Sequence, residues 1–349
     1  MDKTAPTAIS QIWEEQALPS ASVEPIWQRE LRDATRSVPD LLEKLGLNPN
    51  QTSVGTDSLF PLLVPDSYLR RMEFGNPLDP LLHQILPRQA ENQTVPGFQT
   101  DPVQDLPASP IPGLIHKYQN RVLLILTGNC AVHCRYCFRR HFPYEQSIRS
   151  EQSWEPALDY LAEHSEVNEV ILSGGDPLIW NDRRLGNLMK RLAEIEHLKR
   201  IRIHSRLPIV LPSRITTGLL EMLRGTRLQP LFVVHANHAR ELVADCAEAL
   251  QRIVQSGIPL LNQAVLLRNV NDTLAAQRAL CERLVDLGAI PYYLHQLDRV
   301  AGAAHFEVDR ERGARIVAEL QQILPGYAVP RYVEDIPGRS AKTELRGDL

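Results

Sequence analysis

From about Arg121 onward, short apolar runs alternate with longer segments of helical periodicity, and this alternation constrains the fold more than any other feature. The runs that we expect to be strands cover residues 122–126, 169–172, 200–204, 231–235, 260–265 and 291–295. Helical patterns lie near residues 154–164, 183–194, 213–223, 240–255, 274–287 and 309–324. Strands that alternate with helices of this length predict βαβ units and a parallel sheet. Six such units predict an α/β fold, a partial (β/α)6 barrel of the TIM type.

The first 110 residues differ in character from the rest of the chain. Proline and polar residues are frequent there, and helical patterns appear only around residues 24–45 and 66–71. We therefore interpret residues 1–110 as a helical N-terminal extension, residues 111–325 as the barrel and residues 326–349 as a short C-terminal segment. A chain of 349 residues, 43% of them hydrophobic, is long enough to bury the core of one large catalytic domain.

Composition excludes several classes of protein. The net charge of −4 does not favour a nucleic acid or a membrane surface as a partner. The N-terminus lacks the basic and then apolar run of a signal peptide, and no stretch approaches 18 apolar residues. Five cysteines, of which Cys246 and Cys281 are isolated, do not form the framework of a secreted disulfide protein. We therefore expect a cytoplasmic protein.

Three cysteines follow the first expected strand in the run Cys130-Ala-Val-His-Cys134-Arg-Tyr-Cys137. A cluster of four irons normally takes four cysteines, so three thiolates leave one iron open to another ligand. The C-x3-C-x2-C spacing, with Tyr136 before the last cysteine, resembles the motif of radical S-adenosylmethionine enzymes. In those enzymes the open iron binds the amino and carboxylate groups of the cofactor, which we expect here too.

Zinc is the alternative metal for this loop. A zinc site needs a fourth Cys or His ligand, and His133 and His141 lie close enough in the sequence to supply it. Spacing alone therefore favours an iron–sulfur cluster without removing zinc.

Polar residues cluster where each expected strand ends, which is where the chemistry of parallel barrels lies. Gly174 and Gly175, followed by Asp176, come directly after the second strand, and a glycine pair lets the backbone approach a ligand closely. The later strands carry or end in His204-Ser-Arg, His235-Ala-Asn-His, Asn262-Gln263 and His295-Gln-Leu-Asp298. This succession exceeds what solubility requires and predicts a site at that edge of the sheet.

Other charged residues suggest ligand groups. Arg139 follows the last cysteine, and a guanidinium binds a carboxylate through paired hydrogen bonds. Lys117, Tyr118 and Arg121 precede the first expected strand, and two cations with a phenol can hold a phosphate. Asp298, at a strand end, can bind the ammonium group of a substrate. Each of these residues is by default a solvated surface group.

The run Asp335-Ile-Pro-Gly-Arg-Ser-Ala-Lys342 stands near the end of the chain. Its small residues form a tight-turning lead to a lone lysine. A lysine in a pocket can form a Schiff base with pyridoxal phosphate, whereas a lysine near a chain end is more often a solvated charge. Position alone leaves both interpretations open.

Taken together, these residues resemble the lysine 2,3-aminomutase family of radical enzymes. The resemblance extends from about Val64 to Lys342. Its motifs include Phe74-Gly-Asn-Pro-Leu-Asp-Pro, Pro96-Gly-Phe-Gln-Thr-Asp-Pro, Cys130 to Arg140, Ser173-Gly-Gly-Asp-Pro-Leu, Leu266-Leu-Arg-Asn-Val-Asn-Asp and Pro291-Tyr-Tyr-Leu-His-Gln-Leu-Asp. It implies that a [4Fe-4S] cluster, S-adenosyl-L-methionine and pyridoxal 5′-phosphate share one active site.

The resemblance also assigns roles by motif position. It implies that Cys130, Cys134 and Cys137 are the cluster ligands and that Lys342 is the Schiff-base lysine. Lys117, Tyr118 and Arg121 match the positions that hold the pyridoxal phosphate group. Arg139 matches the residue that binds the substrate carboxylate, and Asp298 and Asp335 match those that bind the distal amino group. The positions implied for S-adenosylmethionine are Gly174, Gly175, Asp176, His235 and Gln263.

The chain departs from the longer members of the family. Those members carry additional C-terminal cysteines that bind zinc, whereas this chain ends seven residues after Lys342, so we expect no zinc. The short form and the run Phe138-Arg-Arg-His-Phe-Pro-Tyr most resemble the bacterial branch that makes (R)-β-lysine for translation elongation factor P.

The implied activity is an isomerase that converts L-lysine to (R)-β-lysine. Its implied partners are L-lysine, an external electron donor of the flavodoxin or ferredoxin type and, indirectly, elongation factor P and its lysyl ligase. A homo-oligomer is compatible with the sequence. Two alternatives stay open, namely an aminomutase for another amino acid such as arginine, and a non-catalytic iron–sulfur or zinc-binding protein.

Overall fold

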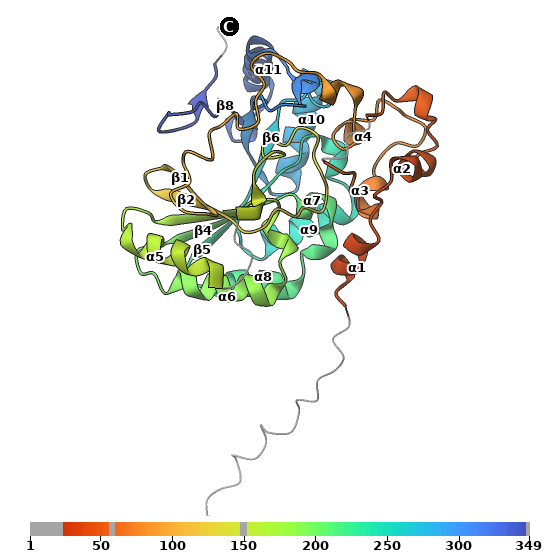
Figure 1. Cartoon of the computed structure of the whole chain (residues 1–349). Coiled ribbons are helices and arrows are strands. Elements are labelled where there is room, and N and C mark those ends of the chain that lie inside the picture. The colour runs from red at the N-terminus through yellow and green to blue at the C-terminus, as the bar shows by residue number, and fades with distance from the viewer. Residues whose placement is uncertain (1–23, 56–59, 147–151, 347–349) are drawn as a thin grey trace, which may run out of the picture.

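One curved sheet forms the centre of the protein in the computed structural model, which describes residues 24–55, 60–146 and 152–346 (Figure 1). Neighbouring strands from β2 to β8 are parallel, and β1 and β9 pair antiparallel at the two edges. The order in the sheet is the order in the chain: β1 (Leu114–Tyr118), β2 (Arg121–Ile125), β3 (Glu169–Ser173), β4 (Arg200–Ser205), β5 (Gln229–Val234), β6 (Leu260–Val265), β7 (Ile290–His295), β8 (Arg331–Glu334) and β9 (Thr343–Glu344).

Helices connect the parallel strands and cover the outside of the sheet (Figure 1). They begin where the sequence offers side-chain acceptors. Asn181, Thr216 and Thr273 each accept a hydrogen bond from a backbone N–H of the first turn that follows. The elements are α5 (Glu155–Glu163), α6 (Asp182–Ala193), α7 (Leu207–Val210), α8 (Thr217–Arg224), α9 (Ala244–Gln255), α10 (Leu274–Asp286) and α11 (Arg310–Ile323).

The predicted α/β partial (β/α)6 barrel is confirmed, and the structure adds strands that were not expected. The six expected strands correspond to β2 to β7, and β8 adds a seventh parallel strand. The structure also makes residues 114–118, expected only as a lead into the first strand, into β1. Both segments mix charged and apolar residues, so their pairing partners, rather than a local apolar run, make them strands. The proposed division into three segments remains a prediction.

The N-terminal segment is helical, but the pattern expected over residues 24–45 breaks into α1 (Ile26–Arg32) and α2 (Val38–Lys44). Between them Thr35 exchanges two backbone hydrogen bonds of 2.9 Å with Val64. Ser37 then caps α2. With α3 (Asp66–Leu69) and α4 (Pro80–His83), these helices lie along one side of the barrel, where α3 packs on α7 (Figure 1).

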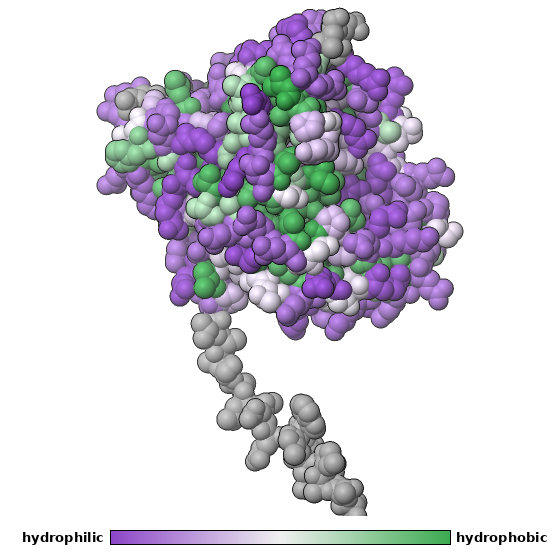
Figure 2. Space-filling view, turned by 180° about the vertical axis from the view of Figure 1, so that it is seen from behind, coloured by the Kyte–Doolittle hydropathy of each residue, from purple (hydrophilic) through white to green (hydrophobic). Residues whose placement is uncertain are grey.

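The exterior is mostly hydrophilic. On the face opposite to that of Figure 1, hydrophobic residues reach the surface in a central band that hydrophilic residues surround (Figure 2). Among the described helices, none combines the length and the apolar character that crossing a membrane requires.

Candidate active site

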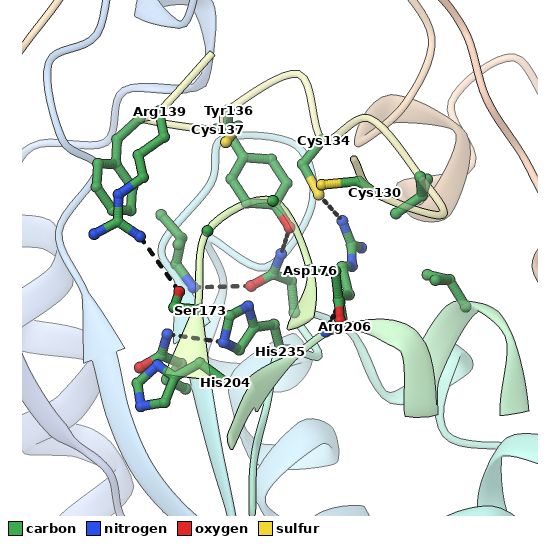
Figure 3. A pocket seen from close by; sticks show the side chains of 18 of the residues that line it. Cys130, Cys134, Tyr136, Cys137, Arg139, Ser173, Asp176, His204, Arg206 and His235 are labelled. Atoms are coloured by element: carbon green, nitrogen blue, oxygen red, sulfur yellow. Dashed lines mark hydrogen bonds between the residues drawn. The ribbon is translucent and has the colours of Figure 1, made fainter. Parts of the chain in front are cut away.

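The three predicted cluster cysteines share one wall of a cavity at the carboxyl ends of the parallel strands (Figure 3). The loop that follows β2 carries them, and a turn in which the Cys137 N–H donates to the Cys134 carbonyl at 3.0 Å brings the last two together. Burial raises the pKa of the Cys130 thiol well above its usual range and that of Cys137 to about 11. A nearby cation would favour the ionised form of these two thiols.

The spacing of these thiols bears on which metal fits. Within the described residues, no three His, Cys, Asp or Glu side chains converge closely enough to hold a single metal ion. The cysteines of a four-iron cluster each bind a different iron, so they do not have to converge on one point. Three cysteines on one cavity wall are therefore compatible with a cluster of several irons.

Arg206, which follows β4, reaches this wall, and no role at the cysteines was predicted for it. Its Nη1 donates to the Sγ of Cys134 at 2.6 Å (Figure 3). Its Nη2 is held by Gln84 Oε1 at 2.6 Å and by Glu241 Oε2 at 3.0 Å. Of the three cysteines, Cys134 is the one that this guanidinium contacts. The other partners of the guanidinium, Gln84 and Glu241, come from distant parts of the chain. The one feature of the sequence that could have pointed to Arg206 was its position at the end of an expected strand.

The two glycines after β3 serve the packing of backbone against backbone. A Cβ atom on Gly174 would lie 2.6 Å from the carbonyl oxygen of Thr127, and one on Gly175 would lie 2.4 Å from that of Asn129. Gly174 also has a φ of 122°. The loop before Cys130 occupies the space that these glycines leave, so their close approach is to that loop, and both still line the cavity.

The Asp176 carboxylate is committed to backbone and side-chain donors of the protein. It accepts hydrogen bonds from Ser205 Oγ at 2.8 Å and from the backbone N–H groups of Leu178, Arg206 and Leu207. Burial is the main reason that its pKa rises to about 6. Asp176 lines the cavity, and its side chain joins β3 to the start of α7.

A second cavity, with an empty volume of about 1540 Å³, adjoins the first. The two share wall residues that include Arg139, His235, Gln263 and Asp298. The predicted phosphate residues and the predicted Schiff-base lysine line the second cavity together with Asp335: Lys117, Tyr118, Arg121 and Lys342. Residues from both ends of the barrel sequence thus meet in one continuous space.

Lys342 lies just before β9, which pairs with β8 and turns the chain end back onto the barrel. Its Nζ lies 2.9 Å from Asp335 Oδ2. The Tyr118 hydroxyl donates to the same carboxylate at 3.5 Å. Asp298 is partly buried, and this desolvation, opposed by the charge of Lys342, raises its pKa to about 7. Two acids and one amine therefore share this part of the cavity.

Arg139 and Lys117 meet at a carboxylate that was not predicted. Asp105 Oδ2 accepts from Arg139 Nε at 2.8 Å, and Asp105 Oδ1 lies 2.6 Å from Lys117 Nζ. Arg139 Nη1 also lies 3.4 Å from Ser173 Oγ (Figure 3). The sequence contained no signal for Asp105, because it lies in an irregular loop far from any expected strand end.

Three histidines line both cavities and are uncharged. Burial is the main cause that lowers the pKa of His235 to about 3 and those of His204 and His295 well below the usual range. Gln263 Nε2 lies 3.0 Å from His235 Nε2. The Nε2 atoms of His204 and His295 are buried without a hydrogen-bond partner among the described residues. Buried polar atoms of this kind are suited to a ligand in the cavity.

Every predicted cluster, cofactor and substrate residue lines one of the two cavities, whereas His133 and His141, the alternative zinc ligands, line neither. The structure therefore confirms that they lie together, while the role of each one remains a prediction. Sequence reasoning missed Asp105, which lies in a loop. It noticed four further residues only as parts of polar strand ends, namely Ser173, His204, Arg206 and His295, and they come from the ends of three strands.

Comparison with known proteins gives consistent matches. The model of the Radical SAM superfamily matches residues 124–276. A protein of Escherichia coli named L-lysine 2,3-aminomutase is 46% identical over 322 residues, which cover 91% of this chain and 94% of that protein. Proteins with the same name from Haemophilus influenzae and Clostridium subterminale are 43% and 35% identical, each over 91% of this chain, and the matches cover 94% and 77% of their own lengths.

Proposed function

The chain belongs to the L-lysine 2,3-aminomutase family of radical S-adenosylmethionine enzymes, and we propose that it converts L-lysine to (R)-β-lysine. The identity of 46% over 91% of the chain carries this proposal. The geometry supports it, because three cysteines and a lysine line adjoining cavities of one barrel. The enzyme is an isomerase.

Membership of the family implies a [4Fe-4S] cluster and S-adenosylmethionine, for which the three cysteines are the ligands that fit. These groups supply a one-electron cleavage that yields a radical able to remove a hydrogen atom from the substrate. The chain's part is to bind and orient. Cys130, Cys134 and Cys137 would hold the cluster, and His235 and Gln263, which line the same cavity, would contact S-adenosylmethionine.

We further propose that pyridoxal phosphate binds in the second cavity through Lys342, with its phosphate near Lys117, Tyr118 and Arg121. When bound, it would supply the electron-accepting group that assists migration of the nitrogen from the α- to the β-carbon. The cavity fits this group, because an amine and a set of phosphate-binding side chains line the same wall. Uncharged histidines that line the same cavity add donors and acceptors without adding charge.

Substrate recognition follows from the charges in the cavity. We propose that Arg139 binds the carboxylate of lysine and that Asp298 and Asp335 bind its distal ammonium group. An analogue without that positive charge would leave partly desolvated carboxylates without this partner and should bind more weakly. Glutamate is disfavoured by the same carboxylates. They do not distinguish lysine from arginine.

We propose that the product serves the modification of translation elongation factor P, with an electron donor of the flavodoxin or ferredoxin type. This proposal is supported by the share of each relative's length that the chain matches. The chain matches 94% of the E. coli and H. influenzae proteins but only 77% of the longer Clostridium protein. A purified lysyl ligase that attaches the product to elongation factor P would test this part separately.

The decisive experiment is turnover under anaerobic conditions with a reductant, S-adenosylmethionine, pyridoxal phosphate and either L-lysine, L-arginine or L-glutamate. We expect the β-isomer of lysine by chromatography and no isomer of glutamate. Iron, sulfide and pyridoxal are measured separately, because their absorbances overlap. Isomerisation of arginine but not of lysine would show that arginine is the substrate. A protein that holds the cluster but isomerises none of the three amino acids would support the non-catalytic alternative.

The raised pKa of Asp298 predicts a dependence of substrate binding on pH. Its carboxyl is protonated below about pH 7 in the ligand-free protein, and only the ionised form attracts an ammonium group. The KM for L-lysine should therefore rise as the pH falls from 8 to 6. Asp298→Asn should have a high KM that no longer changes over this interval. A wild-type KM that stays constant, or full activity of Asp298→Asn, would contradict the role given to Asp298.

A further inference from the structure

The turn at residues 101–106 buries an acid and exposes an apolar residue. Asp105 is 3% exposed, whereas its neighbour Leu106 is 46% exposed. In a surface loop the reverse arrangement, with the aspartate exposed and the leucine buried, would be more favourable, because burying an ionised carboxylate costs free energy. The conformation of this turn is therefore determined by what Asp105 contacts.

The backbone of the turn is also strained and held in place. Gln104 adopts a φ of 52°, a left-handed conformation that residues other than glycine rarely adopt. The Asp101 carboxylate accepts hydrogen bonds from the backbone N–H groups of Asp105 at 2.9 Å and of Leu106 at 3.1 Å. Strain of this kind persists where the surrounding contacts require it, and it is concentrated at functional sites.

The buried carboxylate holds two cations at once. Asp105 Oδ1 lies 2.6 Å from Lys117 Nζ, and Asp105 Oδ2 accepts from Arg139 Nε at 2.8 Å. Lys117 Nζ also donates to the Val103 carbonyl at 2.5 Å. Burial opposes ionisation of Asp105, but the charges of Arg139 and Lys117 outweigh it and lower its pKa. The carboxylate is therefore ionised at neutral pH.

These contacts leave particular hydrogen-bond donors free for ligands. Because Nε of Arg139 donates to Asp105 and Nη1 lies 3.4 Å from Ser173 Oγ, the remaining N–H groups of its Nη atoms are the donors available to a carboxylate. An ammonium group has three hydrogens, and the turn takes two of those on Lys117, so one remains for an anionic ligand. Both cations line the cavity that Lys342 lines.

Resting on the proposed function, we propose that Asp105 is a positioning residue that orients Arg139 for the substrate carboxylate and Lys117 for the cofactor phosphate. The turn at residues 101–106 thereby links the substrate and cofactor sites through one carboxylate. The opposite hypothesis is that Asp105 competes with the ligands by neutralising the two cations. The two hypotheses predict changes of opposite sign when the charge of Asp105 is removed.

The test uses the cluster-loaded full chain and Asp105→Asn. We expect the KM for L-lysine to rise about tenfold or more while kcat changes far less, since a misplaced buried donor chiefly costs binding. Equilibrium dialysis against pyridoxal phosphate, without S-adenosylmethionine or lysine, should show a Kd that is weaker by a similar factor. Asp105→Glu, which keeps the charge, should recover part of both losses.

Asp182→Asn is the matched control, because Asp182 pairs with the buried Arg214 on the outside of the barrel. It should leave the KM and the Kd unchanged. If Asp105→Asn does not fold, Asp101→Ala removes the acceptors that hold the turn and should weaken both constants in the same direction.

Unchanged or tighter constants in Asp105→Asn would overturn the proposal, as would equal losses in Asp182→Asn. A wild-type chain that isomerises no lysine and retains no pyridoxal phosphate would instead reject the proposed function, so the two failures can be told apart.

Discussion

Lys342→Ala is expected to abolish the isomerisation of L-lysine, by roughly 10³-fold or more, because it removes the amine that would bind the pyridoxal cofactor covalently. The structure supports a large effect, since Lys342 lines the same cavity as the proposed phosphate residues and is 2.9 Å from Asp335. The variant should lose bound pyridoxal while keeping the iron and sulfide of the wild type. Elemental and cofactor analysis of the reconstituted protein, followed by turnover, measures both.

The matched control for this variant is Lys190→Ala, whose lysine is exposed on α6. It should retain both cofactors and full activity. Lysine turnover near the wild-type rate in Lys342→Ala would show that the covalent anchor is another residue. So would a full complement of covalently bound pyridoxal after reduction with borohydride.

Cys134→Ala is expected to give the reverse pattern, with loss of cluster iron and sulfide and of turnover but retention of the pyridoxal site. A cluster held by three cysteines cannot lose one without a second open iron, and Cys134 is also the thiol that Arg206 contacts at 2.6 Å. We expect turnover to fall by roughly 10³-fold or more, since radical formation requires the cluster. Iron and sulfide assays and electron paramagnetic resonance of the reduced protein measure the loss.

Cys281→Ala is the control, because Cys281 is a free buried cysteine distant in sequence from the motif. It should keep the cluster and the activity, with a loss of stability on the order of 1 kcal/mol for the smaller side chain. Wild-type iron content in Cys134→Ala would mean that another residue completes the cluster. The two variants together separate the cysteine site from the lysine site, because each should remove one cofactor and spare the other.

The barrel was predictable because its signals are local. Apolar runs such as 260–265, followed by helical periodicity, specify a strand and a helix within a short window, and β6 (Leu260–Val265) agrees with its prediction at both ends. Where a strand depends on its partner, the prediction failed. The short β9 (Thr343–Glu344) has no apolar pattern and forms because it pairs with β8. The break between α1 and α2 likewise depends on Thr35 meeting Val64.

The candidate site divides in the same way. The spacing of Cys130, Cys134 and Cys137 needs only eight consecutive residues, so it was readable without a structure. Lys342 and the substrate residues were identified through a resemblance spread over most of the chain, and the structure placed them around adjoining cavities. The sequence suggested that the glycine pair lets a ligand approach the backbone. The structure shows that the loop before Cys130 packs against these glycines and leaves no room for a side chain there.

By itself the sequence determined the alternating strands and helices, the cysteine motif and the family, because each is written in neighbouring residues or in ordered motifs. Only the tertiary structure decided that Asp105 joins Arg139 to Lys117 and that Arg206 reaches Cys134. These contacts join residues 34 and 72 positions apart. Such pairs form because strands and loops distant in the chain end at the same edge of the sheet, and no local pattern of residues records which of them will meet there.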